Sequence, residues 1–486
     1  MDRSQADTRA GGVVGILALA GIVAAITQTL VVPLIGELPV ILGTTASNAS
    51  WVITATLLAA AVATPVAGRL GDMYGKRRML LVSTVPLIAG SAICALSSSV
   101  VPMIAGRGLQ GIGMGVVPLG ISLLRDVVPP ARLGSAIAVM SASMGVGGAL
   151  GLPFSAAIAE NVSWRVLFWV VAALSLLIAG LIRFLVPADR PNAAPGGFDL
   201  LGAIGLGSAL VCLLLAVSKG ADWGWSSGTT LGLFAATVVI LLAWGRWELR
   251  SDEPLVDLRV TARPQVLMTN AASMLVGFAM YAQSLVVPQL LQLPEATGYG
   301  LGQSMLAMGL WMAPAGLMMM IVSPLGAKLS AAYGPRTTLV VGSLIIALGY
   351  GVSLPLLGST WGLLVVTVVG STGIGFAYGA MPALIMGAVP RSETASANSF
   401  NTLMRSIGSS VSAAVIGVVL AQMTTDFGGF TLPSEDGFRA AMLIGCGVGV
   451  AAAVVAFLIP VERTAAGPRE ASAPSAATPS EAAARA

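Results

Sequence analysis

The feature that most limits what this chain can fold into is a series of apolar stretches, each about 20 residues long, along almost its whole length. Inside a bilayer the backbone must satisfy its own hydrogen bonds, so each stretch is predicted to be a helix. The alternation of polar and apolar residues that marks a membrane β-barrel is missing. Fourteen helices are expected to span the membrane, at residues 13–36, 51–70, 79–98, 101–123, 134–158, 165–186, 199–218, 229–248, 266–290, 303–325, 338–357, 361–387, 395–421 and 438–460.

The composition supports an all-α integral membrane protein. Of the 486 residues, 56% are hydrophobic and 9% are charged, which leaves too little polar surface for a water-soluble exterior. The sequence has no histidine, and Cys94, Cys212 and Cys446 each lie inside an apolar stretch without a CxxC pair. We therefore expect buried thiols, no metal site, no cofactor and no nucleic-acid partner. Because no nucleophile–base constellation is found, we do not expect an enzyme.

The positions of the basic residues predict the topology. Of the 25 Lys and Arg residues, two lie within spans, three lie on one side, and the remaining 20 lie on the side of both termini. The positive-inside rule then places both termini in the cytoplasm of a protein of the plasma (inner) membrane. Residues 1–12 are expected to form a cytoplasmic tail. The Ala/Pro/Ser-rich residues 461–486 are expected to be a disordered cytoplasmic tail.

An internal repeat predicts two related halves. "TPVAGRLGDMYGKRRML" (64–80) matches "SPLGAKLSAAYGPRTTL" (323–339) at an offset of 259, with six of seventeen positions identical. The "GIG" of 111–113 recurs at 373–375, an offset of 262. Nearly constant offsets favour duplication over chance. We expect one six-helix bundle over 13–190, a second over 266–460, and two inserted helices with a linker over 191–265.

Two motifs carry a resemblance to a known family. "GRLGDMYGKRRML" (68–80) resembles the loop between the second and third helices of the major facilitator superfamily, and "IAGRGLQGIGMG" (104–115) is similar to its fourth-helix signature. The fourteen spans are similar to the drug:proton antiporter branch. The resemblance implies the major facilitator fold and alternating access about a central site. The altered fifth-helix motif "GALGLPFSAA" (148–157) leaves proton-coupled nutrient symport as an alternative.

The motif at 68–80 is predicted to contain a conformational latch made of Gly68, Asp72, Gly75 and Arg77. Asp72 is expected to approach an Arg or the positive end of a neighbouring helix. Gly68 and Gly75 are expected to permit a tight turn. The alternative is that the cations of the motif only fix the topology. Since the repeat carries Ala331 in place of Asp72, the latch should be asymmetric.

Ionisable residues inside the spans are the candidates for proton coupling. Arg107 and Arg405 each cost on the order of 2.5–3.5 kcal/mol at mid-bilayer, so each should face a polar cavity or a partner. Glu37, at the outer end of the first span, is the plausible intramembrane carboxylate, and we predict that it faces Arg107. The alternatives are arginines that bind backbone carbonyls and a solvated Glu37.

The resemblance implies that spans 1, 4, 9 and 12 line the centre. The candidate substrate-binding residues are therefore Gln28, Gln110, Tyr281, Gln283 and Tyr378, with Met308 and Trp311 of span 10 as an apolar wall. The alternative for each is helix packing or contact with lipid. We predict a monomer that exports amphipathic small molecules, such as an antibiotic or toxic metabolite, in exchange for protons. A membrane sensor or scaffold that does not transport is a further alternative.

Overall fold

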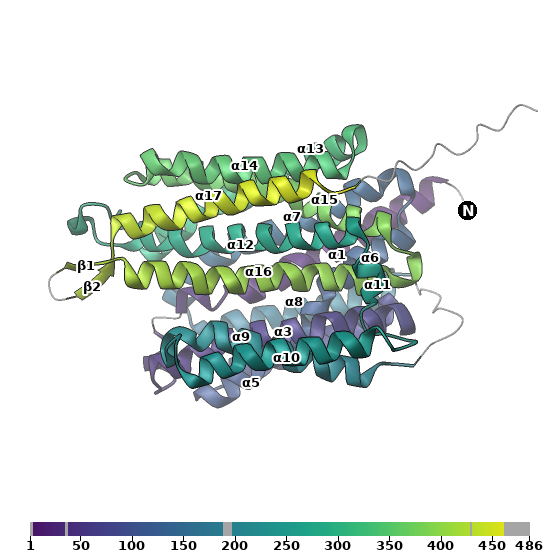
Figure 1. Cartoon of the computed structure of the whole chain (residues 1–486), viewed down its shortest axis with the longest axis horizontal. Coiled ribbons are helices and arrows are strands. Elements are labelled where there is room, and N and C mark those ends of the chain that lie inside the picture. Colours follow the sequence, from purple (N-terminus) through teal and green to yellow (C-terminus); the bar gives the residue numbers. More distant parts are fainter. Residues whose placement is uncertain (1–2, 35–36, 188–196, 428–429, 461–486) are drawn as a thin grey trace, which may run out of the picture.

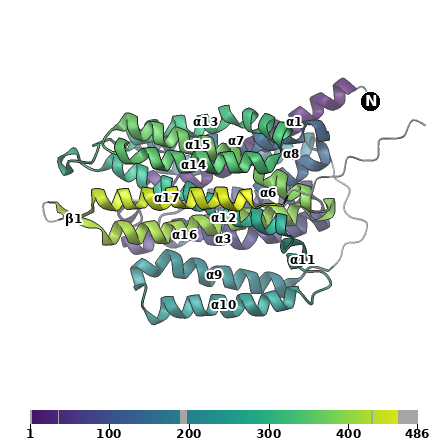
Figure 2. The same cartoon turned by 45° about the horizontal axis from the view of Figure 1, so that its top comes forward.

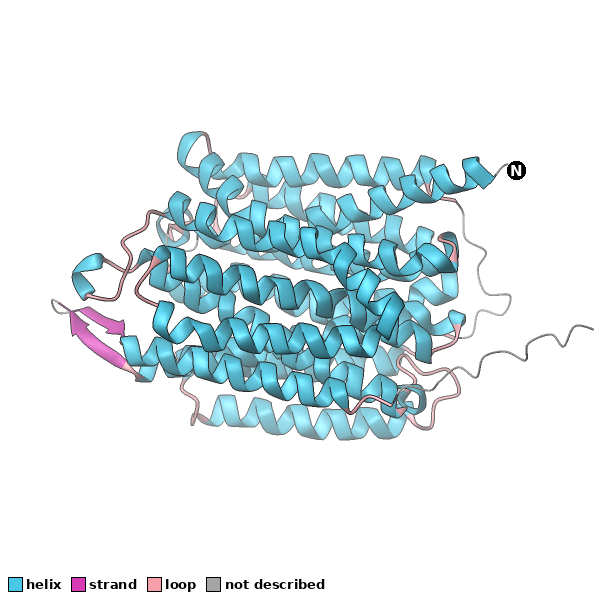
Figure 3. Cartoon of the chain, turned by 90° about the horizontal axis from the view of Figure 1, so that it is seen from above, coloured by secondary structure: helices cyan, strands magenta, loops and turns pink. Residues whose placement is uncertain are grey.

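The structure, a computed structural model, describes residues 3–34, 37–187, 197–427 and 430–460. These residues form a bundle of long, roughly parallel and antiparallel helices with one small hairpin (Figures 1 and 3). The helices are α1 (Arg3–Thr29), α2 (Leu38–Ile41), α3 (Ala46–Tyr74), α4 (Lys76–Leu96), α5 (Val100–Ile112), α6 (Val116–Val127), α7 (Pro130–Asn161), α8 (Trp164–Leu185), α9 (Leu200–Trp223), α10 (Gly228–Glu248), α11 (Leu258–Thr261), α12 (Pro264–Gln292), α13 (Met305–Tyr333), α14 (Pro335–Leu356), α15 (Thr360–Ala388), α16 (Thr394–Gln422) and α17 (Glu435–Phe457).

Among the described residues, 14 segments are long and apolar enough to cross a membrane, which confirms the predicted number of spans. One of them, Val100–Val127, consists of α5, a 3-10 turn and α6. Because the number is even, α1 begins and α17 ends at the same end of the bundle (Figure 1). We call this end the N/C face and the opposite end the distal face.

The chain differs from the predicted boundaries in two places. Helix α1 begins at Arg3, so most of the expected tail at 1–12 continues the first helix. The distal face carries an antiparallel hairpin, β1 (Thr424–Phe427) with β2 (Phe430–Pro433), that the apolar pattern did not indicate. The tail expected at 461–486 lies outside the described residues. The domain boundaries at 190/191 and 265/266 stay predictions.

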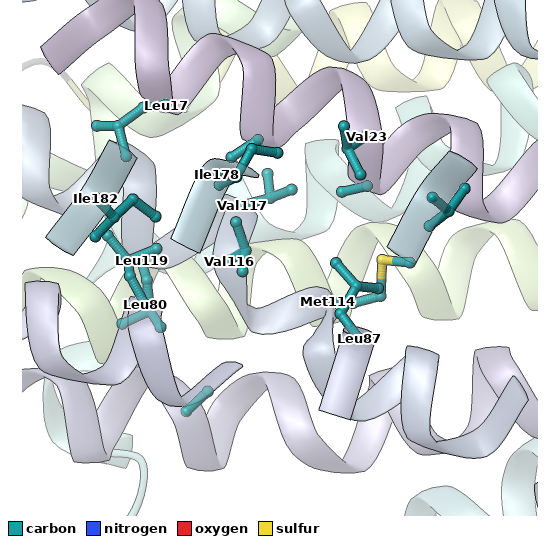
Figure 4. Close-up of a cluster of buried hydrophobic side chains, with 14 of the residues drawn as sticks. Leu17, Val23, Leu80, Leu87, Met114, Val116, Val117, Leu119, Ile178 and Ile182 are labelled. Atoms are coloured by element: carbon teal, nitrogen blue, oxygen red, sulfur yellow. The ribbon is translucent and has the colours of Figure 1, made fainter. Parts of the chain in front are cut away.

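Each half has its own apolar core. In the N-terminal half, buried side chains of α1, α4, α6 and α8 interlock along the length of the bundle. Leu17 and Val23 of α1 face Val117 and Leu119 of α6, and Ile182 of α8 lies beside them (Figure 4). A second buried cluster joins α12, α14, α15 and α17 in the C-terminal half.

The two halves meet along two seams, one between α3 and α16 and one between α7 and α13. The repeat offset of 259 maps residues 46–74, which form α3, onto 305–333, which form α13. A similar offset maps α7 onto α16. A twofold rotation therefore exchanges the two seams, as expected for duplicated halves in parallel orientation.

The repeated loops also match. Gly75 (φ 98°) and Gly334 (φ 86°) both adopt positive φ and connect the second helix of a half to its third. Glycine is required there because a side chain disfavours this backbone conformation. The following arginines also correspond: Arg77 donates to carbonyls near the end of α8, and Arg336 donates to Phe457 O at the end of α17.

The inserted helices α9 and α10 form a hairpin on the outside of the bundle (Figure 2). Helix α9 packs on both α3 and α16, so it covers the α3–α16 seam. Its buried residues Leu206, Leu210 and Leu214 share an apolar cluster with Ala61 of α3 and Leu403 of α16. The inserted pair therefore contacts both halves.

Two neighbouring glycines of α7 test the packing of the first half. A Cβ at Gly147 would lie 2.8 Å from Ala25 Cβ of α1, whereas a Cβ at Gly148 would meet no atom within 4 Å. We expect Gly147→Ala to destabilise the protein by roughly 1–3 kcal/mol, because overpacking displaces α1. Gly148→Ala should leave stability equal or slightly higher. Thermal unfolding in detergent measures both, and equal loss in the two variants would contradict this packing.

Candidate functional site

A polar contact between the halves is made by Asp72 in the last turn of α3. Its carboxylate accepts hydrogen bonds from the backbone amides of Ala395 (3.1 Å) and Ser396 (2.8 Å) in the first turn of α16. Asp72 is buried. An anion is stabilised at a helix amino end, where free amides and the helix dipole act together. Asp72 therefore ties the two halves at the N/C face.

Gly68 makes this contact possible. A Cβ at Gly68 would lie 2.6 Å from Ser399 Cβ and 2.8 Å from Ala395 O, so only glycine lets α16 come this close. The predicted role of Gly68 in a tight turn is wrong, because α3 continues as a helix to Tyr74. Gly75 alone provides the turn.

A second tie across the N/C face comes from α6 and was missed in the sequence. Arg125 Nη1 donates to Val389 O (3.2 Å) and to Thr394 Oγ1 (2.7 Å), and Ser122 Oγ donates to Thr394 O (3.1 Å). The only signal in the sequence is a basic residue in the last turn of the fourth span. The positive-inside rule explains a basic residue at that position equally well.

Arg77, which we grouped with the latch, binds the end of a helix in its own half. Its guanidinium binds Ile182 O (3.4 Å) and Arg183 O, near the carboxyl end of α8. A cation stabilises the free carbonyls there. The neighbouring Lys76 pairs with Asp126 at 2.6 Å, also within the N-terminal half. These cations fix the half internally, while Asp72 reaches across.

Arg107 is the centre of a buried polar network in the N-terminal half. Its Nη1 donates to Thr27 O of α1 and to Gln110 Oε1, both at 2.8 Å, and its Nε donates to Val52 O of α3 at 3.1 Å. Gln110 in turn donates to Ser91 Oγ of α4 at 2.8 Å. Arg107 and Gln110 are fully buried, so in this conformation they hold four helices together.

Glu37 lies apart from this network. It is exposed and occupies the N-cap of the short helix α2 on the distal face. Among the hydrogen bonds and ion pairs of the described residues, Glu37 and Arg107 share none. The predicted coupling pair is therefore not formed in this structure.

In the C-terminal half, the structure brings Arg405 and Tyr378 together. The Arg405 guanidinium carbon lies 4.4 Å from the centre of the Tyr378 ring, a cation–π contact, and Tyr378 Oη donates to Met280 Sδ at 3.0 Å. The backbone carbonyl of Tyr378 accepts from Ser141 Oγ of α7 at 2.9 Å, which links this cluster to the other half.

The other predicted substrate residues are scattered. Gln28 is exposed and donates to Met114 Sδ at 3.6 Å, Tyr281 is half-buried, and Gln283 packs against Gly370. Met308 is buried in the C-terminal core. Trp311 lies near the distal end of α13, where it donates to Gln303 and packs edge-on against the exposed Trp361. A pair of tryptophans near a helix end fits the membrane interface better than a central wall.

The model of the Major Facilitator Superfamily matches residues 17–413. This chain belongs to that superfamily. It is 28% identical over 395 residues to the tetracenomycin C resistance and export protein of Streptomyces glaucescens, a match that covers 78% of this chain and 70% of that protein. It is 26% identical over 426 residues to multidrug resistance protein 3 of Bacillus subtilis, covering 85% and 80%.

The fold of this superfamily member is shared with the proton:xylose symporter XylE, with a TM-score of 0.64 at 14% identity over 93% of this chain and 96% of that one. The family match confirms the major facilitator fold and shows that the protein is a multi-pass membrane transporter and not an enzyme.

The Arg107 network predicts a strict requirement for a guanidinium. In Arg107→Lys, one ammonium cannot reach the carbonyls of Thr27 and Val52 together, so a buried acceptor loses its partner at a cost of roughly 1–3 kcal/mol. We expect a clearly lower unfolding temperature in detergent. Arg165→Lys, at an exposed arginine that binds Ser97 O, is the control and should change little. Equal unfolding temperatures would contradict the structural role of Arg107.

The Asp72 tie predicts that the charge holds the N/C face closed. In Asp72→Asn the charge-assisted bonds to α16, worth roughly 1.5–3 kcal/mol, weaken, so open conformations should become more populated. Spin labels at the exposed positions Ser135 and Ala332, in a cysteine-free background, would report this as longer inter-label distances.

Asp126→Asn is the matched control for Asp72→Asn. It removes another carboxylate of the N/C face, but one that pairs with Lys76 inside the same half. Its distance distribution should equal that of the parent protein. An unchanged distribution in Asp72→Asn would show that this contact does not control opening.

Proposed function

We propose that the protein exports amphipathic small molecules in exchange for protons by alternating access. The observation that carries the proposal is the Asp72 contact between the two halves, in a chain whose relatives include proteins named for export and multidrug resistance. Such a contact stabilises one of two states that differ by a rocking of the halves. Alternating access requires two such states, because the central site must open first to one side of the membrane and then to the other.

The state of the transporter follows from the proposed orientation. Basic residues cluster at the N/C face, so we place this face in the cytoplasm of the plasma membrane. The ties of Asp72 and Arg125 then close the cytoplasmic side, and the conformation described here is the one in which cargo leaves. Cargo entry requires both ties to break.

The arginines inside the spans bear on the cargo. Arg405 lies over Tyr378 and beside a hydrogen bond that crosses from α7, so this cluster can sense the position of both halves. A buried guanidinium with an aromatic partner suits neutral or anionic aromatic compounds better than dications. We propose Arg405, Tyr378 and the exposed Gln28 as contacts for the cargo. The remaining predicted residues stay proposals: Gln110, Tyr281, Gln283, Met308 and Trp311.

Transport can be tested in inverted vesicles with an acidic lumen and a pH-sensitive dye. A susceptibility panel in an efflux-deficient host, with tetracenomycin C among the compounds, would first identify a substrate. Adding that substrate should then release protons from the lumen. We call the contact of Asp72 with the amino end of α16 the gate. Asp72→Asn should retain substrate binding but lose most of its turnover, since the gate then no longer favours one of the two states.

The other outcomes separate the alternatives. Protons moving together with the substrate would indicate a symporter. Binding without turnover in the parent protein would indicate a sensor or scaffold. Loss of proton release in Glu37→Gln would support Glu37 as a coupling carboxylate, and full release in that variant would remove it from the proposal.

A further inference from the structure

Two carboxyl groups meet at the N/C-face end of the inserted helices. Asp199 is the N-cap of α9, and Glu248 is the last residue of α10. A Cβ at Gly202 would touch both Asp199 Oδ2 and Glu248 Oε1, so these two oxygens lie within about 5 Å of each other. Both acids sit at helix ends in the sequence, so the sequence alone does not predict either as a coupling residue.

The two acids have different surroundings. Asp199 Oδ1 accepts from the Gly202 amide at 2.7 Å, and the Trp247 indole Nε1 donates to both Asp199 oxygens at 3.0 and 3.1 Å. These donors suit a carboxylate anion at a helix amino end. Asp199 is half-buried and therefore also partly solvated.

Glu248 is supported more weakly than Asp199. It is 2% exposed, and neither of its oxygens accepts a hydrogen bond of good geometry; the backbone amides of Val256 and Leu255 and the Trp244 indole approach it without forming one. Among the ion pairs of the described residues, none involves Glu248 or Asp199. Burying an unpaired carboxylate beside a second negative charge is costly, and the group avoids this cost by binding a proton.

We infer that Glu248 and Asp199 form a proton-binding site in which Glu248 carries the proton and Asp199 the charge. A proton fits this pair better than a metal ion, because the indole and the helix amide already occupy the Asp199 oxygens. The described residues also offer no third acidic, Cys or His ligand here.

The site adjoins the gate through the linker after α10. The Trp244 indole and the backbone amides of Leu255 and Val256 lie around Glu248, and the Trp244 Nε1 also lacks a partner. Leu255 O accepts from Ser396 Oγ at 3.2 Å, and the Ser396 amide binds Asp72. An ionised Glu248 would draw these donors to itself and so shift the linker that rests on α16.

The charged group facing Glu248 is Asp199 of α9. The next charges belong to a pocket of ≈ 160 Å³ that Leu255 and Val256 also line, with Arg69 of α3, Glu393 before α16, and the linker acids Asp252, Glu253 and Asp257. Glu248 thus lies near charged groups of both halves, so its protonation can depend on how the halves are arranged. A role of Glu248 in proton-coupled transport rests on the proposed function. The presence of a proton on Glu248 does not.

Infrared spectroscopy of the purified full chain at neutral pH tests the proton directly. The spectrum should contain the carbonyl band of a protonated carboxylic acid. Glu248→Gln should lose the part of that band that comes from Glu248 while folding normally, since glutamine has the shape and charge of a protonated glutamate. Asp252→Asn, at an exposed acid of the same linker, is the control and should keep the band. An unchanged acid band in Glu248→Gln, or failure of that variant to fold, would overturn the inference.

A transport measurement then tests the role in coupling. Glu248→Gln should lose substrate accumulation driven by a pH gradient but keep substrate exchange at equal pH, which requires no net proton movement. Loss of both would indicate a structural role and overturn the coupling role. If the parent protein moves substrate without protons, the proposed function fails while the infrared result on Glu248 still stands.

Discussion

The contact between the Asp72 carboxylate and the amino end of α16 is the constraint on which the arrangement of the two halves depends. The helix itself supplies two free amides and a partial positive charge to this contact. Its geometry depends on the direction of α16, so tilting one half against the other breaks it. The contact exists only because Gly68 lets α16 approach α3 closely. The closed gate therefore depends on the charge of Asp72, on the direction of α16 and on the absence of a side chain at Gly68.

The rest of the seam is built differently from the interior of each half. Within a half, large apolar side chains interlock and Arg107 binds the carbonyls of two neighbouring helices, which makes the half a rigid unit. Between the halves, small residues such as Gly145 and Gly316 pack backbone against side chain, and single hydroxyls such as Ser323 cross the gap. Helix association in lipid has little hydrophobic drive, so such contacts are weak enough to exchange. Motion should therefore occur at the seams.

The sequence predicted the fourteen spans, the duplication and the chemistry of Asp72 well, because these follow from apolar length, repeat offset and the helix dipole. It could not assign Gly68 correctly, since a glycine in a helical seam and a glycine in a turn look alike without the partner helix. Arg77 was grouped with Asp72 by proximity in the chain, although the two side chains point to different halves. The roles of Arg125 and Glu248 could not be predicted for the same reason. The partner of Arg125 lies more than 260 residues away in the sequence, and that of Glu248 lies across the α9–α10 hairpin. Long-range pairing decides these roles.

The inserted helices change how the duplicated scaffold can move. Because α9 packs on both α3 and α16, tilting of the halves must either carry the hairpin with one half or slide it along the other. Near the distal face the buried Lys219 of α9 pairs with Asp222 and lies over the ring of Trp51, which fastens the hairpin to α3. On the N/C face the linker contacts α16 through the hydrogen bond from Ser396 to Leu255 and through the buried side chains of Leu255 and Val256. Since α9 packs as closely on α16 as on α3, opening of the gate must shift the hairpin relative to at least one of these two helices.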